Sequence, residues 1–196
     1  MSNLRDYYRD LLNWEGVPSQ ELIATWPTVL VDEIKTEFQS AVQASQLRGA
    51  ICNLRTGSSN QSIGNQVEEF TIQHLKSHHK EFTISKCSGA GYPDKLLLKR
   101  GSQANIVMEF KATSGWNPAD SNRRVLTCSS AKIRKCVTPP IYHLLCTVMY
   151  RLVGSSAEIQ ALRLDFLEPD TPVDVRLEAS VSHRSLATGP HANIIL

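Results

Sequence analysis

The N-terminal part of the chain carries apolar side chains at helical spacing. The segment Thr28–Leu47 places them every four positions, at Leu30, Ile34, Phe38 and Val42. This period predicts an amphipathic helix. Pro27 suits a first helical turn and Gly49 follows the last periodic residue, so both boundaries fit a helix. Leu4–Trp14 and Ile63–Ser77 are also predicted as helices, the second with one apolar stripe.

The middle of the chain changes to short runs bounded by glycine, which are typical of strands. Three strands are predicted, at Glu81–Cys87, Pro93–Leu98 and Ala104–Lys111. The turn Arg100-Gly101-Ser102 would fold the second and third of them into a hairpin. The hairpin would bring the start of one strand beside the end of the next.

Two further elements are expected after this hairpin. Ile141–Leu152 is apolar almost throughout and follows Pro139-Pro140, so we interpret it as a helix. Glu158–Leu167 alternates apolar and polar residues imperfectly, and we interpret it as another strand. The elements together predict an α/β fold with helices flanking a sheet.

Length and composition predict one domain over residues 1–196, with an N-terminal helical layer at residues 1–55 and a core at residues 61–168. A chain of 196 residues that is 41% hydrophobic can bury one core. No run approaches the ~18 apolar residues of a membrane span, and Met1–Asp10 is too polar for a secretory signal. We therefore expect a soluble, cytoplasmic protein with no membrane partner.

The cysteines are odd in number and form no Cys-x-x-Cys pair; they are Cys52, Cys87, Cys128, Cys136 and Cys146. This pattern argues against a disulfide framework and a zinc ribbon, so we expect reduced, mostly buried thiols. His74 and His78 share a helical face beside His79, but no third ligand is near in sequence. A solvated helix end is the interpretation there.

Two acids and a lysine in the strand region have the spacing of a metal-dependent phosphodiester-cutting site. Alternate side chains of a strand share a face, so Glu109 and Lys111 would lie side by side, on a solvent-facing cleft. The predicted hairpin would bring Asp94 next to Glu109. Such carboxylates can hold a hard divalent cation and a water against a phosphate.

Each half of this pattern has a second copy in the chain. Glu33-Ile34-Lys35 repeats the Glu-x-Lys spacing, and Pro169-Asp170 repeats the Pro-Asp pair. The first lies in the predicted helix Thr28–Leu47, and the second follows its partner instead of preceding it. Only Asp94 with Glu109 and Lys111 combines the right order with two neighbouring strands.

Pro93-Asp94 followed by Glu109-Phe110-Lys111 resembles the motif of the PD-(D/E)xK nuclease superfamily, over residues 61–149. The compact length is most similar to a type II restriction endonuclease. The resemblance implies a restriction-endonuclease-like fold, a central mixed β-sheet flanked by helices, with Mg²⁺ as cofactor. Asp94, Glu109 and the main-chain carbonyl of Phe110 would bind the metal, and Lys111 would orient the attacking water or stabilise the transition state.

The superfamily often uses a glutamate on the helix before the first strand. Glu68 is the candidate for this role, with Glu69 as the alternative, because both flank the apolar stripe of Ile63–Ser77. Adjacent glutamates on a helix are more often simply solvated. Which of the two joins the site is left open by the sequence.

An acid-free run carries five cations, at Arg123, Arg124, Lys132, Arg134 and Lys135. The net charge is only +2, so nonspecific coating of nucleic acid is not expected. The run is either a solvated surface or a set of phosphate contacts. Asn117 would read adenine if its loop enters a groove, while Trp116 beside it either reaches that groove or covers the core.

These inferences favour a Mg²⁺-dependent endonuclease of the type II restriction kind that hydrolyses double-stranded DNA as a symmetric dimer. Twofold symmetry lets one site per subunit address each strand of a palindrome. Two alternatives stay open. A repair or junction-resolving nuclease would carry the same residues but recognise DNA shape. A non-catalytic DNA-binding or assembly module would use Glu109 and Lys111 only as a surface ion pair.

Overall fold

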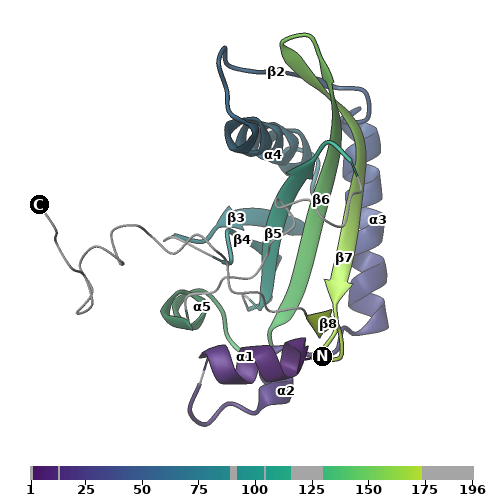
Figure 1. The fold of residues 1–196 in the computed structure, drawn as a ribbon. Coiled ribbons are helices and arrows are strands. Elements are labelled where there is room, and N and C mark those ends of the chain that lie inside the picture. The colour runs from purple at the N-terminus through teal and green to yellow at the C-terminus, as the bar shows by residue number, and fades with distance from the viewer. Residues whose placement is uncertain (1, 13, 89–91, 104, 116–129, 174–196) are drawn as a thin grey trace, which may run out of the picture.

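The computed structural model describes residues 2–12, 14–88, 92–103, 105–115 and 130–173, which form an α/β fold (Figure 1). A curled, mixed sheet of six strands has the order β2-β7-β6-β5-β4-β3. Its strands are β2 (Ile51–Asn53), β3 (Phe82–Lys86), β4 (Lys95–Lys99), β5 (Ile106–Thr113), β6 (Tyr142–Val153) and β7 (Ser156–Leu167). A small second sheet pairs β1 (Ser2–Asn3) with β8 (Pro172–Val173).

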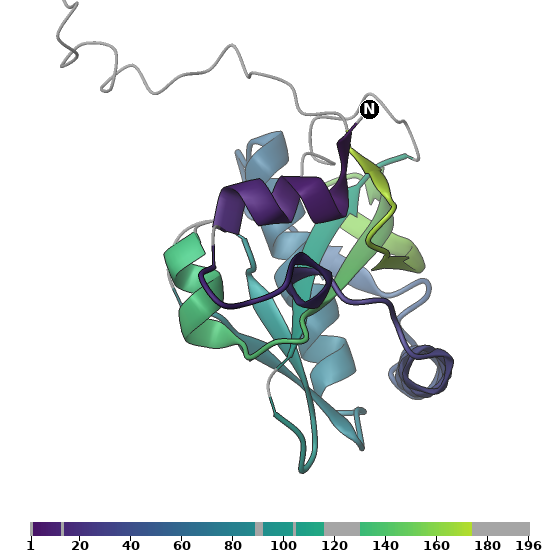
Figure 2. The same cartoon turned by 90° about the horizontal axis from the view of Figure 1, so that it is seen from below.

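Five helices are described: α1 (Leu4–Leu12), α2 (Ser19–Leu22), α3 (Thr28–Ala44), α4 (Asn60–Lys76) and α5 (Ser130–Cys136). Seen from below, α1, α2 and α5 lie together at one end of the sheet (Figure 2). The helices predicted at Leu4–Trp14, Thr28–Leu47 and Ile63–Ser77 are confirmed as α1, α3 and α4, with shifted ends. None of the described helices is long and apolar enough to cross a membrane.

The central strand β5 is buried on both faces because helices cover both. Ile106, Met108 and Phe110 belong to one apolar cluster with α3 and α4. Val107, on the opposite face of the strand, belongs to a second cluster with α1, α2 and α5. The segment 1–55 therefore divides between the two faces, and its β2 also adds a strand to the sheet edge.

Strand pairing follows from how the strands are connected. β5 and β6 are parallel, with α5 in the connection between them, whereas the hairpin partners β4 and β5 are antiparallel. The register sets Lys95 opposite Met108, so the residue before β4 lies next to Glu109. The hairpin predicted from Arg100-Gly101-Ser102 is thereby confirmed.

The predicted helix at Ile141–Leu152 is wrong, because this segment forms the long strand β6. A continuous apolar run also suits a strand covered on both faces, and β6 lies between β5 and β7. Val148 and Thr147, both β-branched, favour a strand, but the run was long enough for either element. Tertiary burial decided the outcome.

The predicted strand at Glu158–Leu167 is confirmed as β7, and a β-bulge explains its imperfect alternation. Met149 pairs with Ala161 and Tyr150 with Ile159, so Gln160 has no partner in the ladder. One extra residue reverses which side chains face which side. Leu162 therefore lies on the same side of the sheet as Ile159.

The expectation of reduced thiols is wrong for two cysteines. Cys87 at the end of β3 and Cys136 at the end of α5 form a disulfide, with Cα atoms 6.5 Å apart. These residues are 49 positions apart, so only the folded chain brings them together. Cys52 and Cys146 are free and buried, as expected. Cys128 lies outside the described residues.

Candidate active site

Strand β5 places Glu109 and Lys111 on the same face, as its period of two requires. Lys111 Nζ lies 2.7 Å from Glu109 Oε1. Lys111 is half-buried, but Glu109 is only 5% exposed, so the expectation that both face open solvent is wrong for the glutamate. The pair is a largely desolvated ion pair within strand β5.

Asp94 joins this pair from the neighbouring strand. Its backbone N–H donates to Glu109 Oε2 over 3.3 Å, because the hairpin register sets the start of β4 beside Glu109. Its carbonyl accepts from the N–H of Cys87, which attaches it to β3 as well. The sequence prediction that the hairpin brings Asp94 next to Glu109 is confirmed.

Helix α4 contributes Glu68, and the structure separates it from Glu69. Glu68 Oε1 accepts a hydrogen bond from the backbone N–H of Ala112 over 3.2 Å, directly after Lys111. Glu69 is exposed and accepts from Gln73 Nε2 on its own helix, over 2.7 Å. Of the two glutamates, Glu68 is the one that reaches β5.

The electrostatics of the cluster reflect an excess of carboxylates over a single ammonium. Burial is the largest influence on Glu68, and it raises the pKa of this carboxyl to about 7. Burial also raises the pKa of Glu109, and the Lys111 ammonium offsets only part of that effect. For Lys111, burial opposes the charged form, but Glu109, Glu68 and Asp94 together raise its pKa.

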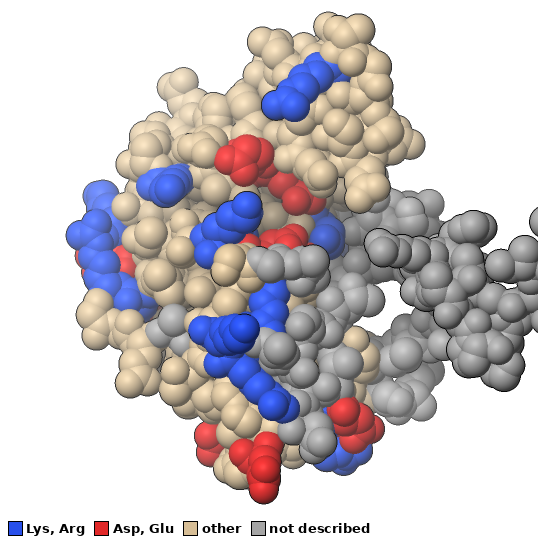
Figure 3. All heavy atoms as spheres, turned by 90° about the vertical axis from the view of Figure 1, so that its left-hand side faces the viewer, with Lys and Arg blue, Asp and Glu red and all other residues tan. Residues whose placement is uncertain are grey.

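The carboxyls of Glu68 and Glu109 and the ammonium of Lys111 thus all have raised pKa values. This is the response expected in a net negative, poorly hydrated environment. Added positive charge would relieve this. On the face of the molecule carried by α4, β4, β5 and α5, acidic side chains gather near the middle with cationic ones around them (Figure 3).

A metal at this position would be bound by few protein ligands. Within the described ranges, no group of three or more His, Cys, Asp and Glu side chains is arranged to hold a metal ion. Mg²⁺ is usually bound through only one or two carboxylates, with waters and substrate phosphates completing its octahedral shell. Asp94 and Glu109, with the Phe110 carbonyl between Glu109 and Lys111 in sequence, fit that requirement in donor type.

A buried pair that the sequence analysis missed supports the segment carrying Asp94. The hydroxyl of Tyr92 lies 2.8 Å from His143 Nδ1, and His143 Nε2 lies 2.8 Å from the carbonyl oxygen of Leu22. Only a protonated Nε2 can donate to that carbonyl, so Nδ1 accepts from Tyr92. Burial lowers the pKa of His143 to about 4, which keeps the ring neutral. A histidine inside the apolar run of β6 was the available signal.

The predicted DNA-contacting run is described only in part. Lys132, Arg134 and Lys135 lie on α5, but Lys132 is only 6% exposed, while Arg134 and Lys135 are exposed. The guanidinium carbon of Arg134 lies 5.8 Å from the ring centre of Trp14. The other candidates, Arg123, Arg124, Asn117 and Trp116, lie outside the described residues.

The histidines in the last turn of α4 and just after it do not form a ligand set in the structure. His78 is exposed, whereas the His79 side chain is 1% exposed and lies 3.6 Å from Glu37 Oε1. His74 Nδ1 lies 3.0 Å from the carbonyl oxygen of Phe70. The solvated helix end was therefore a wrong interpretation for His79, which packs against Phe38.

Comparison with protein-family models, with curated proteins and with solved structures finds no match for this chain.

Proposed function

We propose that this protein is a metal-dependent endonuclease that hydrolyses phosphodiester bonds of double-stranded DNA, with Mg²⁺ as cofactor. The observation that carries the proposal is the convergence of Asp94, directly before β4, with Glu109 and Lys111 of β5 and Glu68 of α4. Three carboxylates around one ammonium suit a cation and, through it, a phosphate. The fold would be of the restriction-endonuclease-like kind.

The residues of the cluster divide the chemistry between them. Asp94 and Glu109, with the Phe110 carbonyl, would hold the metal, which when bound supplies positive charge and a more acidic water. Lys111 keeps its proton, so its ammonium can donate to the attacking water or to a nonbridging phosphate oxygen as negative charge develops. Glu68 adds negative charge and is attached to the strand at Ala112.

Within this class we propose a type II, site-specific enzyme that acts as a symmetric dimer. A twofold dimer would present one cluster to each DNA strand. Arg134 and Lys135 are the exposed cations of α5, and they would contact the phosphates. These contacts would position the duplex without reading its sequence.

A second function is favoured by one observation. Among the described side chains, no group of three or more His, Cys, Asp and Glu residues is arranged to hold a metal ion. A non-catalytic DNA-binding module with this fold would show the same arrangement, with Glu109 and Lys111 acting only as an ion pair.

Plasmid cleavage separates these functions. The protein is incubated with supercoiled plasmid and with a branched DNA junction, in Mg²⁺ and in EDTA. Discrete linear fragments that require Mg²⁺ support the proposal, and selective cutting of the junction would replace it with a structure-directed nuclease. DNA binding without cutting of either substrate would contradict catalysis and favour the binding module.

A further inference from the structure

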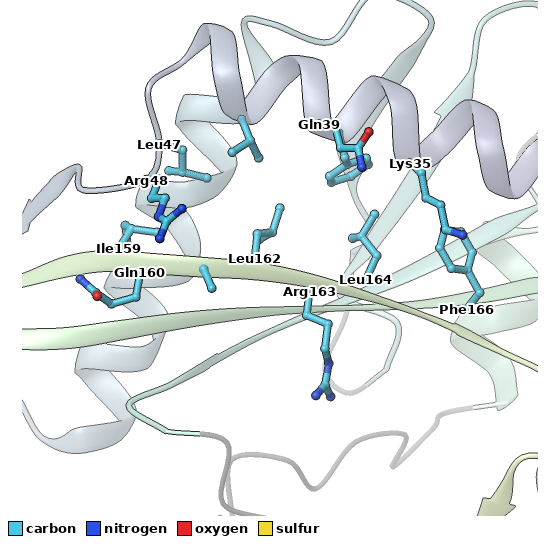
Figure 4. A pocket seen from close by; sticks show the side chains of 13 residues that line it. Lys35, Gln39, Leu47, Arg48, Ile159, Gln160, Leu162, Arg163, Leu164 and Phe166 are labelled. Atoms are coloured by element: carbon cyan, nitrogen blue, oxygen red, sulfur yellow. The ribbon is translucent and has the colours of Figure 1, made fainter.

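A cavity of about 580 Å³ lies between α3 and β7, away from the candidate active site (Figure 4). Most of the residues that line it are apolar, and they include Phe38, Val42, Leu47, Leu162, Leu164 and Phe166. None of the proposed catalytic or metal-binding residues lines it. Its size falls within the roughly 300–1,000 Å³ range of small-molecule sites.

The β-bulge at Gln160 makes the floor of this cavity. Because the bulge reverses the alternation, Leu162, Leu164 and Phe166 face α3, while Arg163 points away from the cavity (Figure 4). These three apolar side chains are only partly buried, so α3 does not cover them fully. The bulge thus presents an apolar strip that the fold itself leaves open.

The ends of the cavity are cationic. Lys35 stands at the Phe166 end, with its Nζ 5.8 Å from the ring centre, and Arg48 stands at the Leu47 end. Among the described residues that line the cavity, no acid balances them, and neither is in an ion pair within the described part of the chain.

The backbone beside Arg48 is fixed to the sheet. Gly49 N–H donates to the Ile159 carbonyl over 2.8 Å, and Ile159 N–H donates to the Ala50 carbonyl over 3.0 Å. The position of Arg48 is therefore anchored at the end of the apolar strip. A guanidinium binds a carboxylate through two parallel hydrogen bonds, which the Lys35 ammonium cannot do.

We propose that this groove binds a linear amphiphile with a carboxylate head and an alkyl chain. The chain would lie on Leu162 and Leu164, and the head would pair with Arg48. Charge complementarity and the apolar strip between two cationic ends support this occupant over a neutral ligand. The proposal is independent of nuclease activity, because the groove shares no residue with the cluster on β4 and β5.

The test uses dansylaminoundecanoic acid, whose fluorescence rises on leaving water, and its uncharged methyl ester. Wild type should bind the acid saturably, with one probe per chain. Gln39→Trp should weaken binding at least about tenfold, because Gln39 is exposed and points toward the cavity, so a tryptophan there would fill it. Circular dichroism checks that this variant is folded.

Arg48→Gln tests the head group, and the exposed Arg100, which does not line the cavity, provides the matched control. Arg48→Gln should weaken binding of the acid about threefold to fivefold, the range of a solvent-accessible ion pair, and leave the ester unaffected. Arg100→Gln should change neither. The proposal would be overturned if wild type showed no saturable binding. It would also be overturned if the Arg48→Gln variant bound the acid with the same affinity as wild type.

Sedimentation of the protein without probe tests the remaining possible occupant of the groove, a second copy of the chain. A wild-type dimer that becomes monomeric in Gln39→Trp would show that a second copy fills the groove, which would also overturn the amphiphile. An unchanged sedimentation coefficient, together with loss of probe binding in that variant, supports a small-molecule site.

Discussion

Two Glu-x-Lys segments with the same spacing have opposite surroundings in this protein. In β5, Glu109 and Lys111 share one face, and their charged atoms are 2.7 Å apart. In α3, residues two positions apart are separated by about 200° around the axis, so Glu33 and Lys35 diverge. Glu33 Oε2 lies 2.5 Å from Lys99 Nζ, and Lys35 extends to the Phe166 ring instead.

The element that carries a short motif therefore decides what the motif can do. In the strand, the two charges are held together and lose solvent, and the pKa values of Glu109 and Lys111 both rise. In the helix, the same residue types remain in contact with water and find separate partners. We expect only the first pair to take part in chemistry.

The largest expected effect comes from replacing the glutamate of each pair. Glu109→Gln should lower the rate of plasmid cleavage in Mg²⁺ by roughly a hundredfold or more, because it removes a proposed metal ligand on which the transition state would depend. Glu33→Gln should cleave within about twofold of wild type. Thermal unfolding should accompany the assay, since Glu109 is buried beside Lys111. Comparable cleavage rates in the two folded variants would contradict the expected difference in function between the β5 and α3 pairs.

Glu68 allows the two pairs to be compared through the pH dependence of stability. In the described structure, no buried glutamate with a raised pKa accompanies the pair on α3. The pKa of Glu68 is raised by burial to about 7, so below its ordinary value of 4.5 it is protonated in both the folded and unfolded states. Between those values the unfolded chain ionises first, and folding stability falls as pH rises. The full penalty, about 3 kcal/mol at most, is present above pH ~7.

Glu68→Gln should therefore stabilise the protein relative to wild type increasingly from pH 4.5 to 7, when no divalent metal is present. Urea unfolding in EDTA at several pH values measures this difference. A constant difference across that range would show that Glu68 has an ordinary pKa, and would remove it from the desolvated cluster.

Asp94 tests whether the strand pair belongs to a metal site. Asp94→Asn should weaken Mg²⁺ binding about tenfold, since an amide lacks the charge that holds a hard cation. Asp32→Asn, an exposed acid beside the helical pair, is the matched control and should leave binding unchanged. Calorimetric titration of Mg²⁺ compares the three proteins. Equal metal affinity in wild type and Asp94→Asn would exclude Asp94 as a ligand.

The smallest effect concerns the exposed cations of α5. Alanine at Arg134 and Lys135 together should weaken DNA binding for all sequences and reduce the slope of log affinity against log salt by up to about 0.9 per lost phosphate contact. Lys35→Ala, an equally exposed cation on α3, should leave the slope unchanged. Fluorescence anisotropy in Ca²⁺ at several salt concentrations measures it. A loss limited to one preferred DNA sequence would mean that Arg134 and Lys135 read bases.

The parts of the site that depend on local geometry could be predicted from the sequence. Glu109 and Lys111 share a face because strands alternate, and Asp94 joins them because a short hairpin fixes the register. The choice between Glu68 and Glu69 required the packing of α4 on β5, since both flank the same apolar stripe.

Features that depend on distance in space were not accessible from the sequence. The segment Ile141–Leu152 was apolar enough for a buried helix or a buried strand, and its position between β5 and β7 decided. The Cys87–Cys136 disulfide and the contact of Tyr92 with His143 join segments separated by 49 and 51 residues. No periodicity or spacing rule connects residues so far apart.

We propose that the Glu-x-Lys pair in β5 is catalytic and that the pair with the same spacing in α3 is not. Lys111→Ala and Lys35→Ala, assayed side by side on supercoiled plasmid in Mg²⁺ under single-turnover conditions, test it most directly. We expect a loss of roughly a hundredfold or more for Lys111→Ala and a rate within about twofold of wild type for Lys35→Ala. Equal rates in the two folded variants, or no Mg²⁺-dependent cleavage by wild type, would contradict it.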